Sequence, residues 1–185
     1  MKLLSIALCA ALSIGSGVTL SNVLMNGDEH EHEQHVTKNQ IDAQAIYPQY
    51  TLEELVNTAD IIVYGKVKTK DKPKKNKFTI GSDEKAEIVE EVKTGVQIKV
   101  KKSIKNDQDL KVINYIEDGG EIDGITYMPE EGLLEKGEEV IIFVNKEGYA
   151  WGPQSVIRVN NGKVDVEGVE RDKDEFIEEL KSYIK

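Results

Sequence analysis

Three histidines lie close together near the start of the chain, among several carboxylates. His30, His32 and His35 all belong to the segment GDEHEHEQH, and His32 and His35 would share one face of a helix. Neutral imidazole is the commonest nitrogen ligand of metals, so a divalent-metal site is one interpretation. The other is a solvated tail, because no residues nearby would hold the ligands in place. We therefore expect only weak binding of Zn²⁺, Ni²⁺ or Cu²⁺ here.

A second group of ligand-type residues lies in the acidic stretch 117–139. Four carboxylates are interspersed with glycines at its start: Glu117, Asp118, Glu121 and Asp123. Oxygen ligands on a flexible backbone could hold Ca²⁺, but the regular spacing of an EF-hand loop is absent. We favour a plain acidic loop. A carboxylate pair such as Asp118 and Asp123 could support acid–base hydrolysis, but nothing else in the sequence supports it.

The third candidate is aromatic. Tyr149 and Trp151 flank Ala150 beside a Gly-Pro pair, and Trp151 is the single tryptophan. Aromatic faces stack on sugars, bases or proline, so these two residues could form a ligand surface. We favour the alternative, in which the tryptophan closes one end of a small barrel.

Other catalytic chemistry is poorly represented. The single cysteine, Cys9, lies in an N-terminal apolar run, and residues 49–185 contain no histidine. This stretch therefore lacks a thiol nucleophile, a thiolate metal site and the commonest general base. We expect a protein that is not an enzyme, has no catalytic residues, and has no cofactor other than weakly bound Zn²⁺ or Ca²⁺.

The charge balance restricts the partners. The 185 residues carry a formal net charge of −10, which opposes contact with nucleic acid and with anionic lipid. The segment 66–77 is locally basic, with the sequence KTKDKPKKNK from Lys68. One interpretation is electrostatic contact with phosphate or a wall polymer. We favour a solvated loop in which lysine and proline prevent edge pairing.

The N-terminal segment indicates export. Met1–Lys2 is positive and residues 3–25 carry no charge, as in a signal peptide or an uncleaved membrane anchor. We expect an extracytoplasmic protein, secreted or anchored through residues 1–25, which would be its only contact with the membrane. Residues 26–48 are predicted to be a flexible His/Glu-rich linker, and residues 49–185 a folded domain.

The domain is organised around the stretch 50–67. Thr51 and Glu54 have the spacing of a capping box, so a short helix should start there. The following run IIVYGKV is β-branched and aromatic, which is typical of a strand buried on both faces. The apolar run EVIIFV, which contains Phe143, predicts a second central strand.

Further strands and one more helix follow from the same kind of pattern. Residues 87–104 predict a long curved strand, residues 110–116 another, and Asn161-Gly162 a tight hairpin turn. Asp172 should open an amphipathic final helix. We expect a mainly β domain of about six antiparallel strands. They should form a small OB-like barrel, closed or partly open, with Phe143 in its core, the short helix N-terminal to it and the last helix packed outside.

These motifs carry a resemblance. The sequence ADIIVYGKV, the Gly-Gly and Asp-Gly turns, LEKGEEVIIFV and the hairpin ending NGKV are similar to small exported proteins of Gram-positive bacteria. That group is of largely unassigned function and has an OB-like barrel that resembles the inhibitory domain of tissue metalloprotease inhibitors. The inhibitory mechanism uses an N-terminal cysteine that this chain lacks. The resemblance therefore implies a fold and an export route, and no catalytic residues.

Together these features favour an extracytoplasmic, non-catalytic binding module for a protein, a peptide or a cell-wall ligand. A metal-binding accessory protein that uses the histidine-rich linker is the alternative. A hydrolase with a carboxylate dyad is disfavoured.

Overall fold

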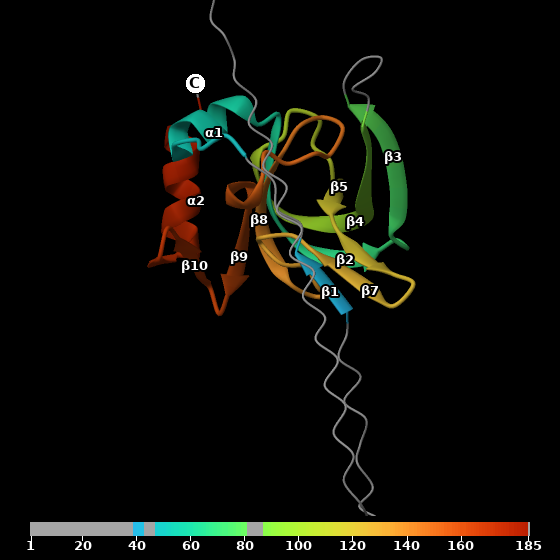
Figure 1. Cartoon of the computed structure of the whole chain (residues 1–185). Coiled ribbons are helices and arrows are strands. Elements are labelled where there is room, and N and C mark those ends of the chain that lie inside the picture. Colours follow the sequence, from blue (N-terminus) through green and yellow to red (C-terminus); the bar gives the residue numbers. More distant parts are fainter. Residues whose placement is uncertain (1–38, 43–46, 81–86, 185) are drawn as a thin grey trace, which may run out of the picture. The chain divides into compact units, whose positions relative to one another are not determined.

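The computed structural model describes residues 39–42, 47–80 and 87–184, all within one compact unit, Thr37–Lys185. The described part is mainly β (Figure 1). Its elements are β1 Asn39–Asp42, α1 Leu52–Thr58, β2 Ile61–Lys70, β3 Lys74–Ile80, β4 Glu87–Lys105, β5 Val112–Asp118, β6 Gly120–Ile122, β7 Ile125–Met128, β8 Glu139–Val144, η2 Pro153–Ser155, β9 Val156–Asn160, β10 Lys163–Val166, β11 Val169–Asp172 and α2 Lys173–Ser182.

The strands form two sheets. The larger has the order β11-β10-β9-β8-β2-β4-β3, with β5 paired to the other edge of β4, and all of its pairs are antiparallel. The smaller has the order β1-β7-β6, in which β1 runs parallel to β7. The predicted long strand is confirmed as β4, whose 19 residues bring three strands together.

The expected closed barrel is not found in the described residues. Closure would require strand pairing between β5 and β8, and this gap is spanned by one isolated bridge, Ile116 with Tyr149. The free side of β8 pairs instead with β9, and the sheet continues outward through β10 and β11. The correct description is a strongly curved open sheet, because the last three strands extend it rather than close it.

Strands β2 and β8 lie at the centre and are buried on both faces, as their apolar sequences predict. They pair from Ile61 opposite Val144 to Lys66 opposite Glu139. Alternate side chains enter two separate clusters: Val63 and Ile142 pack in a cluster with residues of β5, and Ile62 and Phe143 pack in the cluster that the helices cover. One continuous apolar run therefore supplies two cores.

Phe143 corrects a second expectation. It was predicted to lie inside a barrel, away from the last helix, but it belongs to the helix-facing cluster together with Phe176 of α2. Both rings are 0% exposed. The final helix is therefore an integral part of the core, because its apolar stripe covers the face of β8 that carries Phe143.

The helix signals were read correctly, although the order of elements differs. Thr51 and Glu54 form the predicted capping box at α1, and Asp172 caps α2 by accepting from the amides of Asp174 and Glu175. However, α1 is not the first element, since β1 precedes it and pairs with β7. Four residues of the segment expected to be a linker are thus part of the smaller sheet.

The predicted Asn161-Gly162 turn between β9 and β10 is present, with positive φ at both residues.

The shared burial of the two phenylalanines predicts similar costs for their removal. Phe143→Ala and Phe176→Ala should each lower the free energy of unfolding by about 3–5 kcal/mol, since each leaves a cavity in the same cluster. Chemical denaturation measures both values. The exposed Lys146→Ala should change stability by less than about 0.5 kcal/mol. A much smaller cost for Phe176→Ala than for Phe143→Ala would contradict this packing.

Candidate functional site

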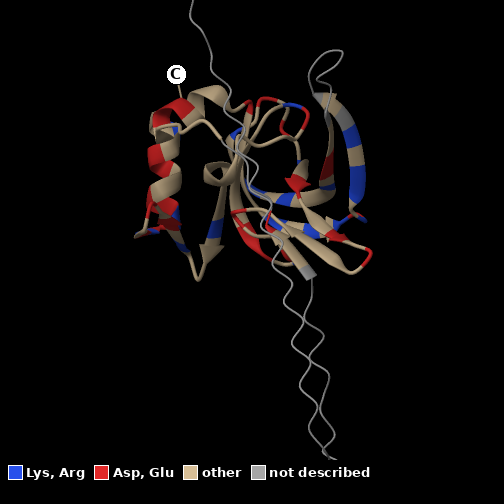
Figure 2. Cartoon of the chain, viewed as in Figure 1, with Lys and Arg blue, Asp and Glu red and all other residues tan. Residues whose placement is uncertain are grey.

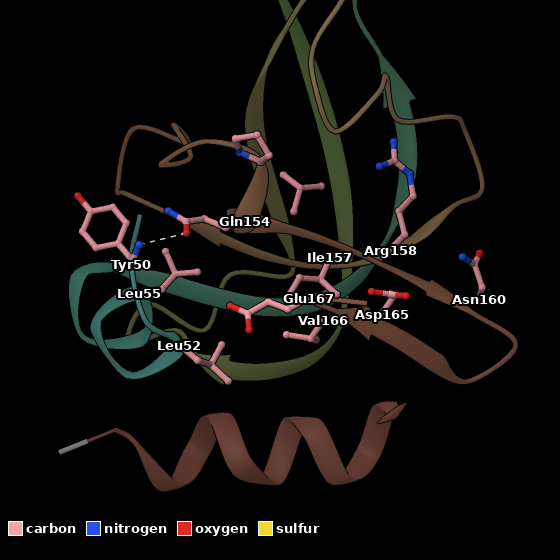
Figure 3. Close-up of a pocket in the computed structure, with 12 residues that line it drawn as sticks. Tyr50, Leu52, Leu55, Gln154, Ile157, Arg158, Asn160, Asp165, Val166 and Glu167 are labelled. Carbon is pink, nitrogen blue, oxygen red and sulfur yellow. Dashed lines mark hydrogen bonds between the residues drawn. The ribbon is translucent and has the colours of Figure 1, made fainter. Parts of the chain in front are cut away.

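A groove of about 390 Å³ lies between α1, η2, β9 and the end of β10. Figure 3 shows Tyr50 and Gln154 at one end and Arg158 and Asn160 at the other. Concave, mostly apolar clefts of roughly 300–1,000 Å³ are the usual form of a ligand site. This groove is therefore the first candidate for the functional site.

The floor of the groove is apolar because it is the outer boundary of the helix-facing core. Leu55 is buried in that core, whereas Leu52, Ile157 and Val166 are half-buried against it and present their outer surface to the groove. The same side chains therefore support the fold on one side and remain available to a ligand on the other.

One side chain fixes the end of the groove near Tyr50. Gln154 Oε1 accepts from the backbone N–H of Tyr50 at 3.2 Å, and Gln154 Nε2 donates to the carbonyl of Pro48 at 2.8 Å. The amide thus satisfies a donor and an acceptor of a segment without regular structure. This bonding holds the entry to α1 against η2.

The opposite rim is acidic. Asp165 and Glu167 are exposed and lie at the turn between β10 and β11. Glu167 and Gly168 both have positive φ, as a two-residue hairpin turn requires, and Asp165 Oδ1 accepts from the N–H of Gly168 at 2.8 Å. The turn therefore holds two carboxylates beside an apolar floor.

Arg158 connects the groove to the loop 129–138. Its guanidinium donates to the carbonyls of Glu131, Gly132 and Leu133, and its Nε lies 3.5 Å from Glu138 Oε1. A guanidinium presents five donors in a fixed fork, which suits such a row of acceptors. The charge of Arg158 is thus directed at the loop and does not neutralise the acidic rim.

The same loop is held from below by a buried ion pair. Glu117 is 1% exposed, and its Oε1 accepts from the N–H of Leu134 at 2.6 Å. Lys70 Nζ lies 2.7 Å from Glu117 Oε2 and donates to the carbonyl of Leu134 at 2.6 Å. Glu117 Oε2 accepts no well-directed hydrogen bond from the described residues, so its contact with Lys70 is best described as an ion pair.

Burial raises the pKa of Glu117 above its ordinary value, and the ion pair with Lys70 and the hydrogen bond from Leu134 oppose this shift only in part. Burial also raises the pKa of Glu131, followed by the nearby charges of Asp118 and Glu117. Burial and the charge of Asp118 raise the pKa of Tyr47 to about 12. Two carboxyls with raised pKa values therefore lie around one loop.

The predicted ligand-type residues do not come together. His30, His32 and His35, like Cys9, lie outside the described residues. Asp118 is bound by Lys93 and accepts from the Tyr47 hydroxyl at 3.3 Å, whereas Asp123 is exposed at the turn between β6 and β7. Among the described residues no group of three or more His, Cys, Asp or Glu side chains is arranged to hold a metal ion.

Tyr149 and Trp151 are also separated by their surroundings. Tyr149 is 48% exposed and lies beside Ile116 of β5. Trp151 is half-buried against the helix-facing core, and its backbone N–H donates to Ser155 Oγ at 3.1 Å. The tryptophan therefore packs on the helix side of the sheet.

Sequence reasoning missed the groove and the burial of Glu117. The groove residues come from segments about a hundred positions apart, and no local motif joins them. Glu117 did carry a signal: it continues the alternation of Ile113 and Tyr115, the inward-facing residues of β5. A strand pattern extended by one step would have placed its carboxyl in the core.

Comparisons with protein-family models, with curated proteins and with solved structures find no match for the chain. In the part of the chain that the structure describes, no helix has the length and apolar character needed to cross a bilayer. The functional argument therefore depends on the geometry of the site itself.

The raised pKa of Glu117 predicts a specific pH dependence. A carboxyl whose folded-state pKa is raised contributes stability below its unfolded pKa, near 4.5, and this contribution is lost as the pH rises through the folded-state value. Glu117→Gln removes the titration and keeps an oxygen that can accept from Leu134. Relative to Glu117→Gln, the wild type should therefore lose free energy of unfolding as the pH increases from about 4.5 to 8.

Urea denaturation of both proteins across this range measures the difference. Glu170→Gln, on an exposed carboxyl of β11, is the matched control and should follow the wild type. A constant difference between Glu117→Gln and the wild type would show that Glu117 keeps an ordinary pKa in the folded protein.

Proposed function

We propose that the protein is a non-catalytic binding module whose ligand is a peptide segment of a partner protein. The observation that carries this proposal is the groove with an apolar floor and an acidic rim, formed by α1, η2 and the β9–β10 hairpin. The groove is lined by side chains that suit recognition. They include no histidine, cysteine or serine, and both carboxylates are exposed.

The chemistry of the groove defines the segment that it would accept. The half-buried faces of Leu52, Ile157 and Val166 favour a large apolar side chain, since covering them removes apolar area from water. Asp165 and Glu167 favour a cationic side chain next to it. The ligand that fits best is an extended or helical segment in which leucine- or phenylalanine-like anchors are flanked by lysine or arginine.

The place of action is proposed from the sequence. The positive start and the uncharged run in residues 1–25 support export, so the partner would be an extracytoplasmic protein or wall-associated peptide. The groove does not depend on that segment, because all of its lining residues belong to the folded unit.

A displayed library of random peptides, selected on the immobilised full-length protein, tests this function. Enriched sequences should combine a large apolar residue with lysine or arginine. An enriched peptide should bind Asp165→Asn/Glu167→Gln at least about tenfold more weakly, because two attractive charges are removed without a change of shape. Isothermal titration calorimetry measures both affinities.

The matched control removes two exposed carboxylates that do not line the groove. Asp123→Asn/Glu147→Gln has the same change in net charge and should keep the wild-type affinity. Equal weakening in both double variants would indicate attraction by net charge alone, and a selection without enrichment would contradict the proposal.

A further inference from the structure

The exposed side of β2 and β4 carries three lysines without an acidic partner of their own. Lys66 of β2 lies directly opposite Lys99 of β4, and Lys68 is two residues further along β2. All three are exposed, while the intervening Val67 is 2% exposed and Ile98, next to Lys99, is 0% exposed. The apolar neighbours point into the core, so the three ammonium groups point to solvent. We call these residues the lysine row.

The pairing of Lys66 with Lys99 is unfavourable for the fold. Directly opposite side chains in an antiparallel pair have Cβ atoms about 5 Å apart, and like charges at this position destabilise the sheet. Among the described residues, four other lysines of β2 and β4 have carboxylate partners: Lys70 with Glu117, Lys93 with Asp118, Lys101 with Glu139 and Lys102 with Glu178. Lys105, at the end of β4, donates instead to backbone carbonyls at the end of α1. The lysine row is thus an exception that the fold does not require.

The carboxylate facing the row is already occupied. Glu139 of β8 lies opposite Lys66, but it is bound by Lys101 Nζ and by the hydroxyl of Tyr64. The hydrogen bond from Lys101, followed by that from Tyr64, lowers the pKa of Glu139, so its charge is present at neutral pH. One carboxylate therefore faces Lys66, Lys99 and Lys101, and a surplus of positive charge remains on this face.

This local positive charge is opposite in sign to the net charge of the whole chain. The protein carries a net charge of −10, yet Figure 2 shows lysine positions gathered on β2, β3 and β4, with acidic positions prominent on α2. Segregated charge creates a local potential that a net charge does not describe. A negatively charged partner would be attracted to the lysines of β2 and β4 and repelled by the acidic side chains of α2.

We propose that the lysine row binds a linear polyanion of repeating phosphates that carries no bases. Lysine binds phosphate as a point charge, and a row of ammonium groups along two strands suits a polymer that contacts several charges in succession. Single-stranded nucleic acid would also need aromatic faces for base stacking. The aromatic side chain beside the row, Tyr64, is buried, with the ammonium groups of Lys101 and Lys173 5.4 and 4.6 Å from its ring centre.

Binding of long-chain inorganic polyphosphate and of a synthetic glycerol-phosphate oligomer to the full-length protein tests this proposal. Three neutralised phosphates predict that the logarithm of the affinity falls with the logarithm of the salt concentration with a slope of about 2. Lys66→Gln/Lys99→Gln should lower this slope to about 0.7 and weaken binding at low salt at least about tenfold. A comparison of the two probes shows whether free polyphosphate or a phosphodiester polymer is the better source of the phosphates.

Lys146→Gln/Lys163→Gln is the matched control, since both lysines are exposed, one after β8 and one on β10. It should keep the wild-type slope. Thermal unfolding should show that Lys66→Gln/Lys99→Gln is at least as stable as the wild type, because a like-charge pair is removed. Equal weakening in both double variants, or tighter binding of oligo-dT than of both phosphate probes, would overturn the proposal.

Discussion

The buried ion pair between Glu117 and Lys70 is the interaction on which the arrangement of the strands depends. Together these two side chains bind both the N–H and the C=O of Leu134, so a loop without regular structure is held at a fully buried residue. A buried charge is costly unless it is paired and hydrogen-bonded. The same loop is bound from the other side by Arg158 of β9. Strands β2, β5 and β9 therefore meet at one loop, and this loop leads directly into β8.

Much of the central fold could be predicted because its signals are local. A few neighbouring residues are enough to predict the apolar strands β2 and β8, the capping box at Thr51 and the Asn161-Gly162 turn. Closure of the sheet could not be predicted in this way. It depends on whether β5 or β9 pairs with the free edge of β8, and both strands have suitable alternation. The prediction of a barrel was wrong for this reason.

The candidate site could not be predicted from the sequence for a related reason. Residues that suggest chemistry by their type, such as Asp118 and Asp123, are held by other partners or exposed at a turn. The groove consists of ordinary residues, among which Leu52 and Ile157 become a surface only when α1 meets β9. Burial likewise gives Glu117 its unusual properties, and its position in the alternation of β5 was the only indication of that burial. In this protein the candidate site therefore follows from packing rather than from a motif.

The pairing of β2 with β8 also has a consequence for how the chain reaches its native state. These strands are far apart in sequence, and Phe143 on β8 is covered only when α2 has docked. Such long-range pairings lose the entropy of closing a large loop before their stabilising contacts form. Domains of this type therefore fold more slowly than helical ones. Until α2 docks, the helix-facing side of β8 remains an apolar surface open to water. A chain that folds in this order would depend on its last helix to avoid aggregation.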